Sequence, residues 1–363
     1  MKKKHLVGVI IGVIFLTCAC IIPSADRNLE REDGSITLTP TPSRTRTPFQ
    51  PIKPTLTSTI TPTPTFTRTS SRTSTSTSTE SATSTITATP FFTGTPTPPA
   101  LMFSGAGDIS ICGQDTDEET AALLRDLPGY VFTLGDNQND TDSLEDFQNC
   151  FDQSWGQYKD RMIPVIGNHE YYTENASGFF SYFGDLAGPL EQGYYSRNLG
   201  DWHIIALNSN CNQIGGCGSD SEMARWLEQD LQQNRQRCTL AMWHTPRWSS
   251  GWHGNNNEMD TIWGLVARYG VELVLNGHDH FYERFSPMNE EGVMDYENGT
   301  RSFIVGTGGA SLRGLYNSTQ NSEVIDSSTF GVLNLSLGDG WYSWKFIPVS
   351  PDGFTDSGNQ DCH

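Results

Sequence analysis

The sequence predicts a mixed α/β (α+β) domain in which two β-sheets pack face to face with helices outside them. Between residues 101 and 275, short apolar runs alternate with amphipathic stretches. From residue 301 onward, strand patterns follow one another without helices between them. Strand–helix alternation followed by a strand-rich end favours two packed sheets covered by helices. The first 99 residues differ in composition and lie outside this pattern.

Four helices and nine strands are expected in this domain. The helices place apolar side chains on one face, as Met223, Leu227 and Leu231 do in the helix expected at 222–233. The expected helices are 118–127, 144–155, 222–233 and 257–269. The expected strands are 101–106, 130–134, 162–166, 202–207, 238–243, 271–275, 301–306, 330–337 and 341–349.

Residues 1–20 have the layout of an export signal. Three lysines at positions 2 to 4 precede an apolar run at 6–16. The segment ends in Thr-Cys-Ala-Cys, and a cysteine after a small residue resembles a bacterial lipoprotein cleavage site with Cys20 as the lipidated residue. Thr17 stands where an aliphatic residue is usual, so a plain signal peptide and an uncleaved N-terminal anchor are the alternatives. All three place the remaining chain outside the cytoplasmic membrane, at the cell surface or secreted.

Residues 21–99 are expected to form a disordered linker that precedes a domain at 100–363. From Ser35 to Pro99 the chain consists almost wholly of Thr, Ser and Pro. Hydrophobic side chains are too sparse there to offset the loss of chain entropy on folding. Repeated prolines favour extended, semi-rigid conformations, so this segment is predicted to act as a stalk.

Charge is divided unevenly between the two parts of the chain. Residues 1–99 contain ten Lys or Arg and five Asp or Glu, whereas residues 100–363 contain 13 and 37, a net charge of −24. Such an acidic domain repels nucleic acid at long range, so no nucleic-acid partner is expected. A phosphate substrate needs local positive charge, and bound metal ions can supply it.

Six cysteines lie in the predicted domain. An even number in an exported protein suggests disulfides. Cys211 and Cys217 flank a Gly-Gly turn and can pair locally. The pairs that would complete the set are Cys112–Cys150 and Cys238–Cys362. A zinc cluster is the alternative, but the domain contains no Cys-x-x-Cys pair.

Polar side chains follow five of the expected strands. In open α/β sheets, ligands bind beyond the carboxyl ends of the strands, which are rigid places from which to direct side chains. Each residue alone also fits a turn or a strand cap, but the ordered set is far more specific than any part. The residues are Asp108, Asp136, Asn168, His244, His278 and His280.

Carboxylate oxygen, amide oxygen and imidazole nitrogen suit Zn, Fe, Mn and similar ions. A carboxylate can bridge two cations and reduce their mutual repulsion. Two ions about 3.5–4 Å apart can clamp a phosphate and lower the pKa of water towards about 7, which makes hydroxide available as a nucleophile. The sequence therefore predicts a two-metal site, with the identity of the metals open.

The motifs resemble a known superfamily when they are taken in chain order. They are Gly107-Asp108, Gly135-Asp136-Asn137, Gly167-Asn168-His169-Glu170, His244 and Gly277-His278-Asp279-His280. The set resembles the calcineurin-like metallophosphoesterases, and residues 277–284 look especially like the purple acid phosphatase branch. The resemblance covers about residues 101–346 and implies a four-layer α-β-β-α sandwich with two metal ions at one edge.

The resemblance also implies roles for individual residues. Asp136 would bridge the two ions. The ligands that complete the first site would be Asp108 and His280, and those that complete the second would be Asn168, His244 and His278. His169 would lie close to the substrate and steady the leaving group or the transition state. His253, nine residues after His244, lies where such enzymes place a phosphate-contacting histidine, with an ordinary loop histidine as the alternative.

Asn139 departs from the purple acid phosphatase pattern. That branch has a tyrosine three residues after the bridging aspartate, and the tyrosine binds ferric iron and gives the colour. Other members of the superfamily use Asp-x-His at the first motif, but Ser110 occupies that position here. The first site therefore lacks both usual extra ligands. We expect a colourless protein with weaker metal binding at the first site and less preference for ferric iron.

The function expected from these features is a surface-anchored or secreted phosphatase that hydrolyses small phosphomonoesters. A phosphodiesterase or nucleotide pyrophosphatase on the same scaffold is one alternative. A non-catalytic binding lipoprotein that keeps the fold is the other. The metal motifs do not separate the two enzymatic functions, which differ in the shape of the pocket they need. Retention of all six ligands and of His169 argues against the non-catalytic alternative.

Overall fold

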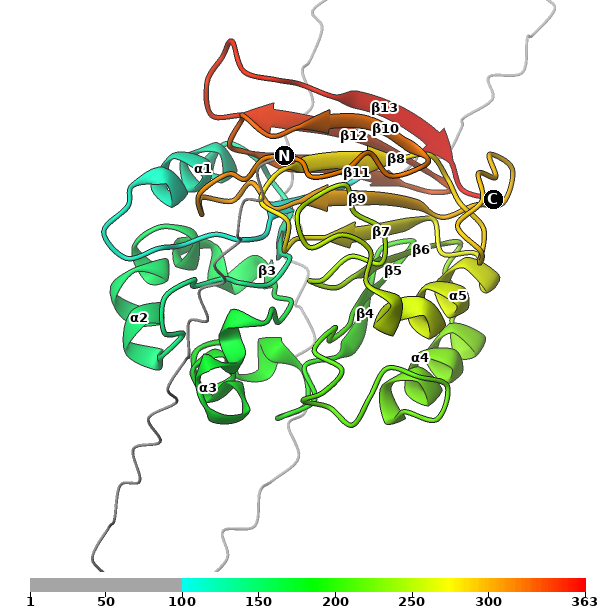
Figure 1. Cartoon of the computed structure of the whole chain (residues 1–363), viewed down its shortest axis with the longest axis horizontal. Coiled ribbons are helices and arrows are strands. Elements are labelled where there is room, and N and C mark those ends of the chain that lie inside the picture. The colour runs from blue at the N-terminus through cyan, green and yellow to red at the C-terminus, as the bar shows by residue number, and fades with distance from the viewer. Residues whose placement is uncertain (1–99) are drawn as a thin grey trace, which may run out of the picture. The chain divides into compact units, whose positions relative to one another are not determined.

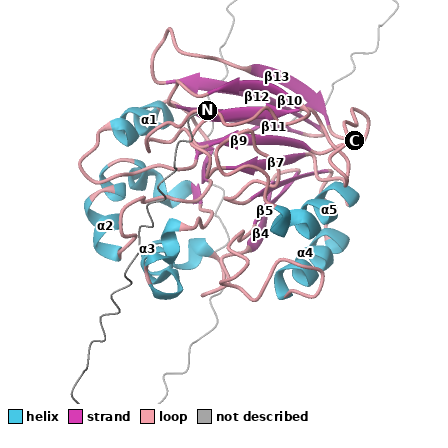
Figure 2. Cartoon of the chain, in the orientation of Figure 1, coloured by secondary structure: helices cyan, strands magenta, loops and turns pink. Residues whose placement is uncertain are grey.

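A computed structural model describes residues 100–363, in which two β-sheets lie face to face between groups of helices (Figure 1). Helices α1, α2 and α3 lie on one side and α4 and α5 on the other, with the strands between them (Figure 2). The predicted four-layer α-β-β-α architecture is confirmed. The predicted export signal, the lipidation site at Cys20 and the predicted linker lie outside the described residues.

Each sheet combines parallel and antiparallel strands, with the parallel strands at one edge of the six-stranded sheet and in the centre of the seven-stranded sheet. In spatial order, the six-stranded sheet contains β13 (Ser357–Asp361), β12 (Trp341–Pro348), β11 (Gly331–Gly338), β1 (Leu101–Ala106), β2 (Tyr130–Thr133) and β3 (Met162–Ile163). The seven-stranded sheet contains β10 (Ser322–Asp326), β8 (Tyr282–Phe285), β9 (Arg301–Val305), β7 (Leu273–Asn276), β6 (Cys238–Met242), β5 (Trp202–Ala206) and β4 (Tyr195–Leu199). β1, β2 and β3 are parallel, as are β5, β6, β7 and β9.

Side chains alternate between two cores along the seven-stranded sheet. On β5, Ile204 joins the core between the sheets, whereas Ile205 packs in the core that contains α4 and α5. Leu273 and Val274 on β7 divide in the same way. This period of two is what a strand buried on both faces requires.

The helices close the outer layers of the domain. The α-helices are α1 (Thr116–Arg125), α2 (Leu144–Asn149), α3 (Ser177–Phe183), α4 (Glu222–Gln233) and α5 (Asp260–Arg268). The 3₁₀-helices are η1 (Phe151–Gln153), η2 (Trp155–Arg161), η3 (His169–Tyr172), η4 (Glu174–Ala176), η5 (Gly184–Ala187) and η6 (Asn257–Met259). No helix in residues 100–363 has both the length and the apolar character needed to cross a membrane.

Three disulfides join the pairs expected from the sequence. Their partners are Cys112 and Cys150, Cys211 and Cys217, and Cys238 and Cys362. The last bridge ties the start of β6 to the end of the chain across 124 residues. In the chain-entropy model, cross-links stabilise a fold mainly by restricting the unfolded chain, and longer loops give larger effects.

The helix expected at 144–155 is wrong in its length. The α-helix ends at Asn149, and residues after the bridged Cys150 continue as the 3₁₀-helices η1 and η2. Strands β4, β8, β10 and β13 were not among the predicted elements. β13 illustrates the reason, because its sequence Ser-Gly-Asn-Gln-Asp carries no apolar pattern and it pairs only with β12 at the sheet edge.

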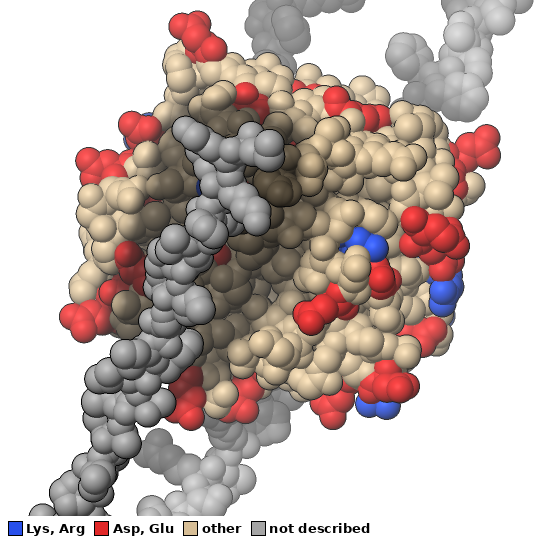
Figure 3. All heavy atoms as spheres, in the orientation of Figure 1, with Lys and Arg blue, Asp and Glu red and all other residues tan. Residues whose placement is uncertain are grey.

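On the face drawn in Figure 3, acidic side chains are more widespread than basic ones, in agreement with the domain charge of −24.

Candidate metal centre

The candidate ligands come from loops that follow strands of both sheets. Asp108 and Asp136 follow β1 and β2 of the six-stranded sheet, and His244 and His278 follow β6 and β7 of the seven-stranded sheet. The strands in each group are parallel, so their carboxyl ends meet at one edge. A hydrogen bond of 2.7 Å from His244 Nδ1 to the carbonyl of Leu134 joins the two groups of loops.

Three candidate ligands have a backbone conformation that side chains usually avoid. Asp108, Asp136 and His278 have φ angles of 57°, 47° and 74°. Non-glycine residues in this left-handed region are uncommon, and such conformations cluster at functional sites. Gly277 precedes His278, and a Cβ atom there would lie 2.8 Å from Asp108 Oδ2. The backbone therefore approaches the site more closely than a larger residue would allow.

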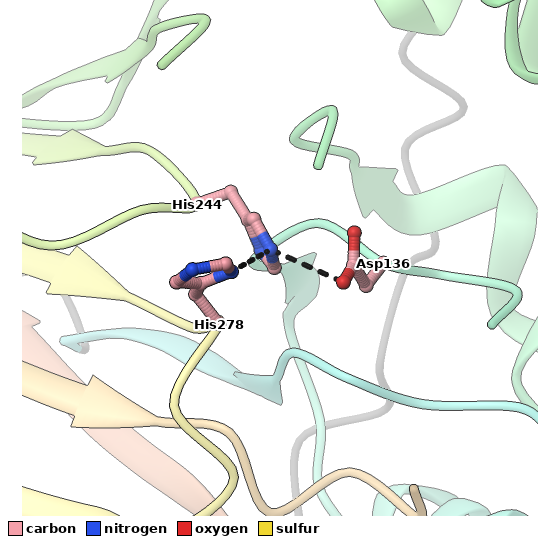
Figure 4. Close-up of side chains that lie close together, drawn as sticks. All are labelled: Asp136, His244 and His278. Carbon is pink, nitrogen blue, oxygen red and sulfur yellow. Dashed lines mark hydrogen bonds and ion pairs between the residues drawn. The ribbon is translucent and has the colours of Figure 1, made fainter. Parts of the chain in front are cut away.

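His244 is the centre of one pocket (Figure 4). Its Nε2 atom lies 3.1 Å from Asn168 Oδ1, 3.1 Å from His278 Nδ1 and 3.2 Å from Asp136 Oδ2. Its Nδ1 atom is held by Leu134, so Nε2 is the nitrogen directed at the other three side chains. We refer to Asp136, Asn168, His244 and His278 as the second pocket.

The second pocket fits a metal ion by the chemistry of its donors. Ligand atoms from Asp136, His244 and His278 all lie within 4.8 Å of one another. Asp136 and His244 are fully or almost fully buried. Two imidazole nitrogens and a carboxylate oxygen facing one point form a donor set suited to zinc or iron.

Protonation of the second pocket follows from its burial and charges. Burial opposes charge on His244, but the carboxylate of Asp136 outweighs it and raises the pKa of His244 to about 10. Burial alone would raise the pKa of Asp136, yet His244 and His169 hold that pKa well below its usual range. Burial and the charge of His244 lower the pKa of His278 to about 3. A cation entering the pocket would therefore displace a proton from His244, as metal binding to histidine generally does.

Asp108 and His280 form a separate pair of candidate ligands, which we call the first pocket. Asp108 Oδ1 lies 3.3 Å from His280 Nε2, is buried and accepts no hydrogen bond. Asp108 Oδ2 accepts a hydrogen bond of 2.8 Å from the backbone N–H of His278. His280 Nδ1 lies 2.8 Å from the carbonyl of Ser311, which directs Nε2 at Asp108. A buried carboxylate oxygen without a donor fits a cation ligand.

Asn139 stands where the resembled branch has a tyrosine ligand. Its amide nitrogen donates to the carbonyls of Asp136 at 2.9 Å and Ser110 at 3.4 Å. Its amide oxygen is buried and has no hydrogen-bond partner. The backbone contacts fix which end of the amide is the nitrogen.

His169 lies against the carboxylate of Asp136. Its backbone N–H donates to Asp136 Oδ1 at 2.9 Å, and its Nε2 lies 3.7 Å from Asp136 Oδ2. Its Nδ1 lies 3.2 Å from the carbonyl of Asn139. The side chain is 22% exposed, so one edge of the ring faces solvent. This arrangement suits a residue that contacts a bound substrate.

His253 lies beside the second pocket from a separate loop. Its ring centroid is 4.1 Å from that of His278, and its side chain is 37% exposed. The structure thus brings all eight sequence-predicted site residues to one region.

Glu170 and Asp279 are two residues within the sequence motifs for which no role was expected. Glu170 is fully buried and accepts hydrogen bonds from the backbone N–H groups of Asp136, Asn137 and Gly167 at 3.1, 2.7 and 2.5 Å. It therefore fixes the loop that carries Asp136. The sequence offered one indication of this role, because Glu170 is a charged residue within a motif of candidate ligands. Its partners could not be identified from the sequence, since they are backbone N–H groups.

Comparisons with known proteins agree with this geometry. The sequence model of the calcineurin-like phosphoesterase family matches residues 106–282. Purple acid phosphatase 15 of Arabidopsis thaliana is 26% identical over 246 residues, covering 56% of this chain and 44% of that protein. Human acid phosphatase type 7 is 29% identical over 211 residues, covering 46% of this chain and 47% of that protein.

A solved structure shows the same fold. The purple acid phosphatase from yellow lupin seeds superposes with a TM-score of 0.60 at 18% identity, covering 72% of this chain and 54% of that one. The chain spans less than half the length of the two curated relatives described above. The family match includes all of the candidate ligands.

Proposed function

We propose that the protein, whose residues 106–282 match the calcineurin-like phosphoesterase family, is a two-metal phosphatase of small phosphomonoesters. The observation that carries the proposal is the convergence of six candidate ligands and His169 at one edge of the two sheets. The similarity to purple acid phosphatases of plants supports a phosphoester substrate.

In this proposal Asp136 would be a ligand shared by the two sites. Its Oδ2 atom lies 3.2 Å from His244 Nε2, and its Oδ1 atom accepts a hydrogen bond from the backbone N–H of His169, so the carboxylate is held in one orientation beside the second pocket. The residues that would complete the two sites are Asp108 and His280 in the first pocket, and Asn168, His244 and His278 in the second. When bound, the ions would activate water as the nucleophile and neutralise charge on the phosphoryl oxygens. The metals are Fe, Zn or Mn by the chemistry of the donors.

Besides holding the ions, the protein must position the substrate and stabilise the leaving group. His169 borders Asp136 and keeps an exposed ring edge, which suits contact with the departing oxygen or the transition state. His253 reaches the same region over the ring of His278, which suits contact with a phosphoryl oxygen. Both histidines can donate hydrogen bonds without being ligands.

Arg313 adds positive charge next to the first pocket. Its backbone N–H donates to the carbonyl of His280 at 2.9 Å, and the residue is exposed. The pKa of His280 is raised above its ordinary value. Burial lowers this pKa, the carboxylate of Asp108 more than offsets that effect, and the charge of Arg313 acts against the rise. In a domain of net charge −24, an exposed guanidinium at this place favours an anionic substrate.

We further propose that the protein is exported and held at the membrane by lipid on Cys20, or secreted. Three disulfides in the domain support an oxidising environment. The lysines and apolar run of residues 1–20 support export. The acidic domain makes nucleic acid an unfavourable partner.

Metal content and turnover test the proposal together. Protein purified and loaded with Zn²⁺, Mn²⁺ or Fe is expected to hold two ions and to hydrolyse a generic aryl phosphate. A diester such as a bis-aryl phosphate, assayed in parallel, tests the phosphodiesterase alternative. A protein that bound no metal and turned over neither ester would contradict both enzymatic functions and favour a binding protein.

The variant His169→Ala tests the assigned role of that residue. It is expected to lower kcat by about 10²- to 10⁴-fold, the range for acid–base and transition-state contacts, while metal content stays near that of the wild type. Elemental analysis of the same samples used for kinetics checks this. Loss of a metal ion in the variant would show that His169 supports the metal site instead.

A further inference from the structure

Asp279 stands between the candidate ligands His278 and His280 but points to a different residue. Its side chain is 2% exposed, and its Oδ1 atom lies 2.8 Å from Nδ1 of His253. The backbone N–H of His253 also donates to Oδ1, at 3.4 Å. A buried aspartate thus holds a partly exposed histidine that comes from a loop 26 residues earlier in the chain.

Further contacts hold the loop of His253 against the same segment. Ser249 Oγ donates to Asp279 Oδ2, so both carboxylate oxygens are engaged. Gly251 packs directly on the carboxylate of Asp279, where any Cβ atom would clash. Ser250 donates to Glu283 through its backbone N–H at 3.0 Å and its hydroxyl at 2.6 Å. Contacts at Ser249, Ser250 and Gly251 therefore hold the loop of His253 in place.

These contacts determine which nitrogen of His253 is free. Because Nδ1 donates to a carboxylate oxygen, Nε2 is the atom left for another partner. The ring lies 4.1 Å from that of His278 at an interplanar angle of 32°, so it extends over the second pocket. Charge-assisted hydrogen bonds of this kind are stronger than neutral ones and fix a ring more firmly.

We propose that Asp279 is a positioning residue that acts through His253, holding the ring so that Nε2 contacts a phosphoryl oxygen of the bound substrate. This inference rests on the proposed function, and it adds a role for the residue between the two ligand histidines. Asp279 touches neither the substrate nor the reacting atoms. Its effect should therefore vanish when His253 is absent.

A double-mutant cycle with Asp279→Ala, His253→Ala and the combined variant tests the proposal. Each single change is expected to lower kcat/KM by about 10²-fold, the effect of misplacing a group by about 1 Å. The double variant should be no worse than the poorer single variant, because residues that act as a unit are not additive. All three should keep the metal content of the wild type. Asp279→Asn, which can still accept from Nδ1, should recover most of the activity.

Asp230→Ala provides a matched control. Asp230 Oδ2 lies 2.7 Å from Nε2 of His203, so it forms a comparable, partly buried aspartate–histidine pair away from the candidate site. This variant should change thermal stability without changing kcat/KM. The proposal is overturned if the losses from Asp279→Ala and His253→Ala add, if Asp279→Ala loses metal, or if it leaves kcat/KM unchanged.

Binding of inorganic phosphate separates this proposal from the proposed function. In metal-loaded protein, calorimetry should show that Asp279→Ala and His253→Ala weaken phosphate binding to the same degree. If the wild type binds metal and phosphate but hydrolyses no ester, the proposed phosphatase function fails and the phosphate affinities still decide the role of Asp279. Unchanged phosphate affinity in Asp279→Ala would contradict that role.

Discussion

The two pockets differ in how many side chains face a common point. In the second pocket, Nε2 of His244 has Asn168, His278 and Asp136 within 3.2 Å. In the first pocket, two side chains face each other, with Asp108 Oδ1 and His280 Nε2 3.3 Å apart. A metal site gains affinity from the number and geometry of its ligands. We therefore infer that the second pocket binds its ion more tightly than the first.

Asn139 explains part of this difference. Its amide nitrogen is committed to the backbone of Asp136 and Ser110, which leaves only a neutral amide oxygen where a tyrosinate would have supplied negative charge. Neutral amides are weaker ligands than phenolates for a trivalent ion. We therefore attribute the unequal metal affinities expected of the two pockets both to Asn139 and to the smaller number of imidazoles in the first pocket.

The largest effect is expected from His244→Ala. It removes the atom that contacts three other candidate ligands, so the second ion should be lost and kcat should fall by about 10³-fold or more, since each ion supplies several kcal/mol of transition-state stabilisation. Elemental analysis and aryl phosphate turnover check this. A variant that kept two ions and normal turnover would show that the second pocket is not a metal site.

Asn139→Tyr should reduce the difference between the two pockets by strengthening metal binding in the first. The phenolate would add a charged ligand, so ferric iron should bind about 10²-fold more tightly, and the iron-loaded variant should show a visible charge-transfer band absent from the wild type. Asn139→Phe is the matched control, because it removes the same amide without adding an oxygen. A visible band in the iron-loaded wild type would contradict the inferred role of Asn139.

A smaller effect, on stability, is expected from changing Asp117 in α1. This helix lies behind the first pocket and supports the segment that contacts Asp108. Thr120 donates to the carbonyl of Gly308 at 2.5 Å, and the backbone N–H of Ala310 donates to the carbonyl of Asp108 at 2.8 Å. On the same helix, burial raises the pKa of Asp117 to about 6, against the stabilising contact from Ser154. The protonated form of Asp117 is therefore favoured by folding.

The sign of the pH dependence follows from that raised pKa. Protonated Asp117 contributes its full stabilisation below about pH 4, the pKa of an aspartate in the unfolded chain. This contribution is lost as the pH rises through about 6, the pKa of Asp117 in the folded protein. Asp117→Asn should remove this loss and raise the free energy of unfolding at pH 7 by about 1–2 kcal/mol. Denaturant unfolding at pH 4 and pH 7 measures it. An equal or larger loss between the two pH values in the variant would contradict the assignment.

Sequence reasoning was most successful where the pattern is local. Strand ends such as Asp136 and His244 could be recognised because apolar runs precede them, and the fold and the three disulfides are confirmed. The helix at 144–155 was predicted too long because the effect of the bridge at Cys150 on the backbone is not visible in helical periodicity.

The contacts that support the site could not be predicted in the same way. Asp279 and His253 are 26 residues apart, and only the folded loops bring them together. Glu170 acts through backbone N–H groups, which every residue except proline has, so no residue type marks its partners. Strand β8 directly follows the ligand loop, and its half-polar sequence Tyr-Glu-Arg-Phe did not indicate a strand.

Calorimetric titration of Zn²⁺ or Mn²⁺ into metal-free protein tests the inequality of the two pockets most directly. The wild type should bind two ions in distinct steps of unequal affinity. His280→Ala should abolish only the weaker step, because His280 belongs to the first pocket. Two equal steps in the wild type, a single ion, or loss of the tighter step in His280→Ala would contradict an asymmetric two-metal centre.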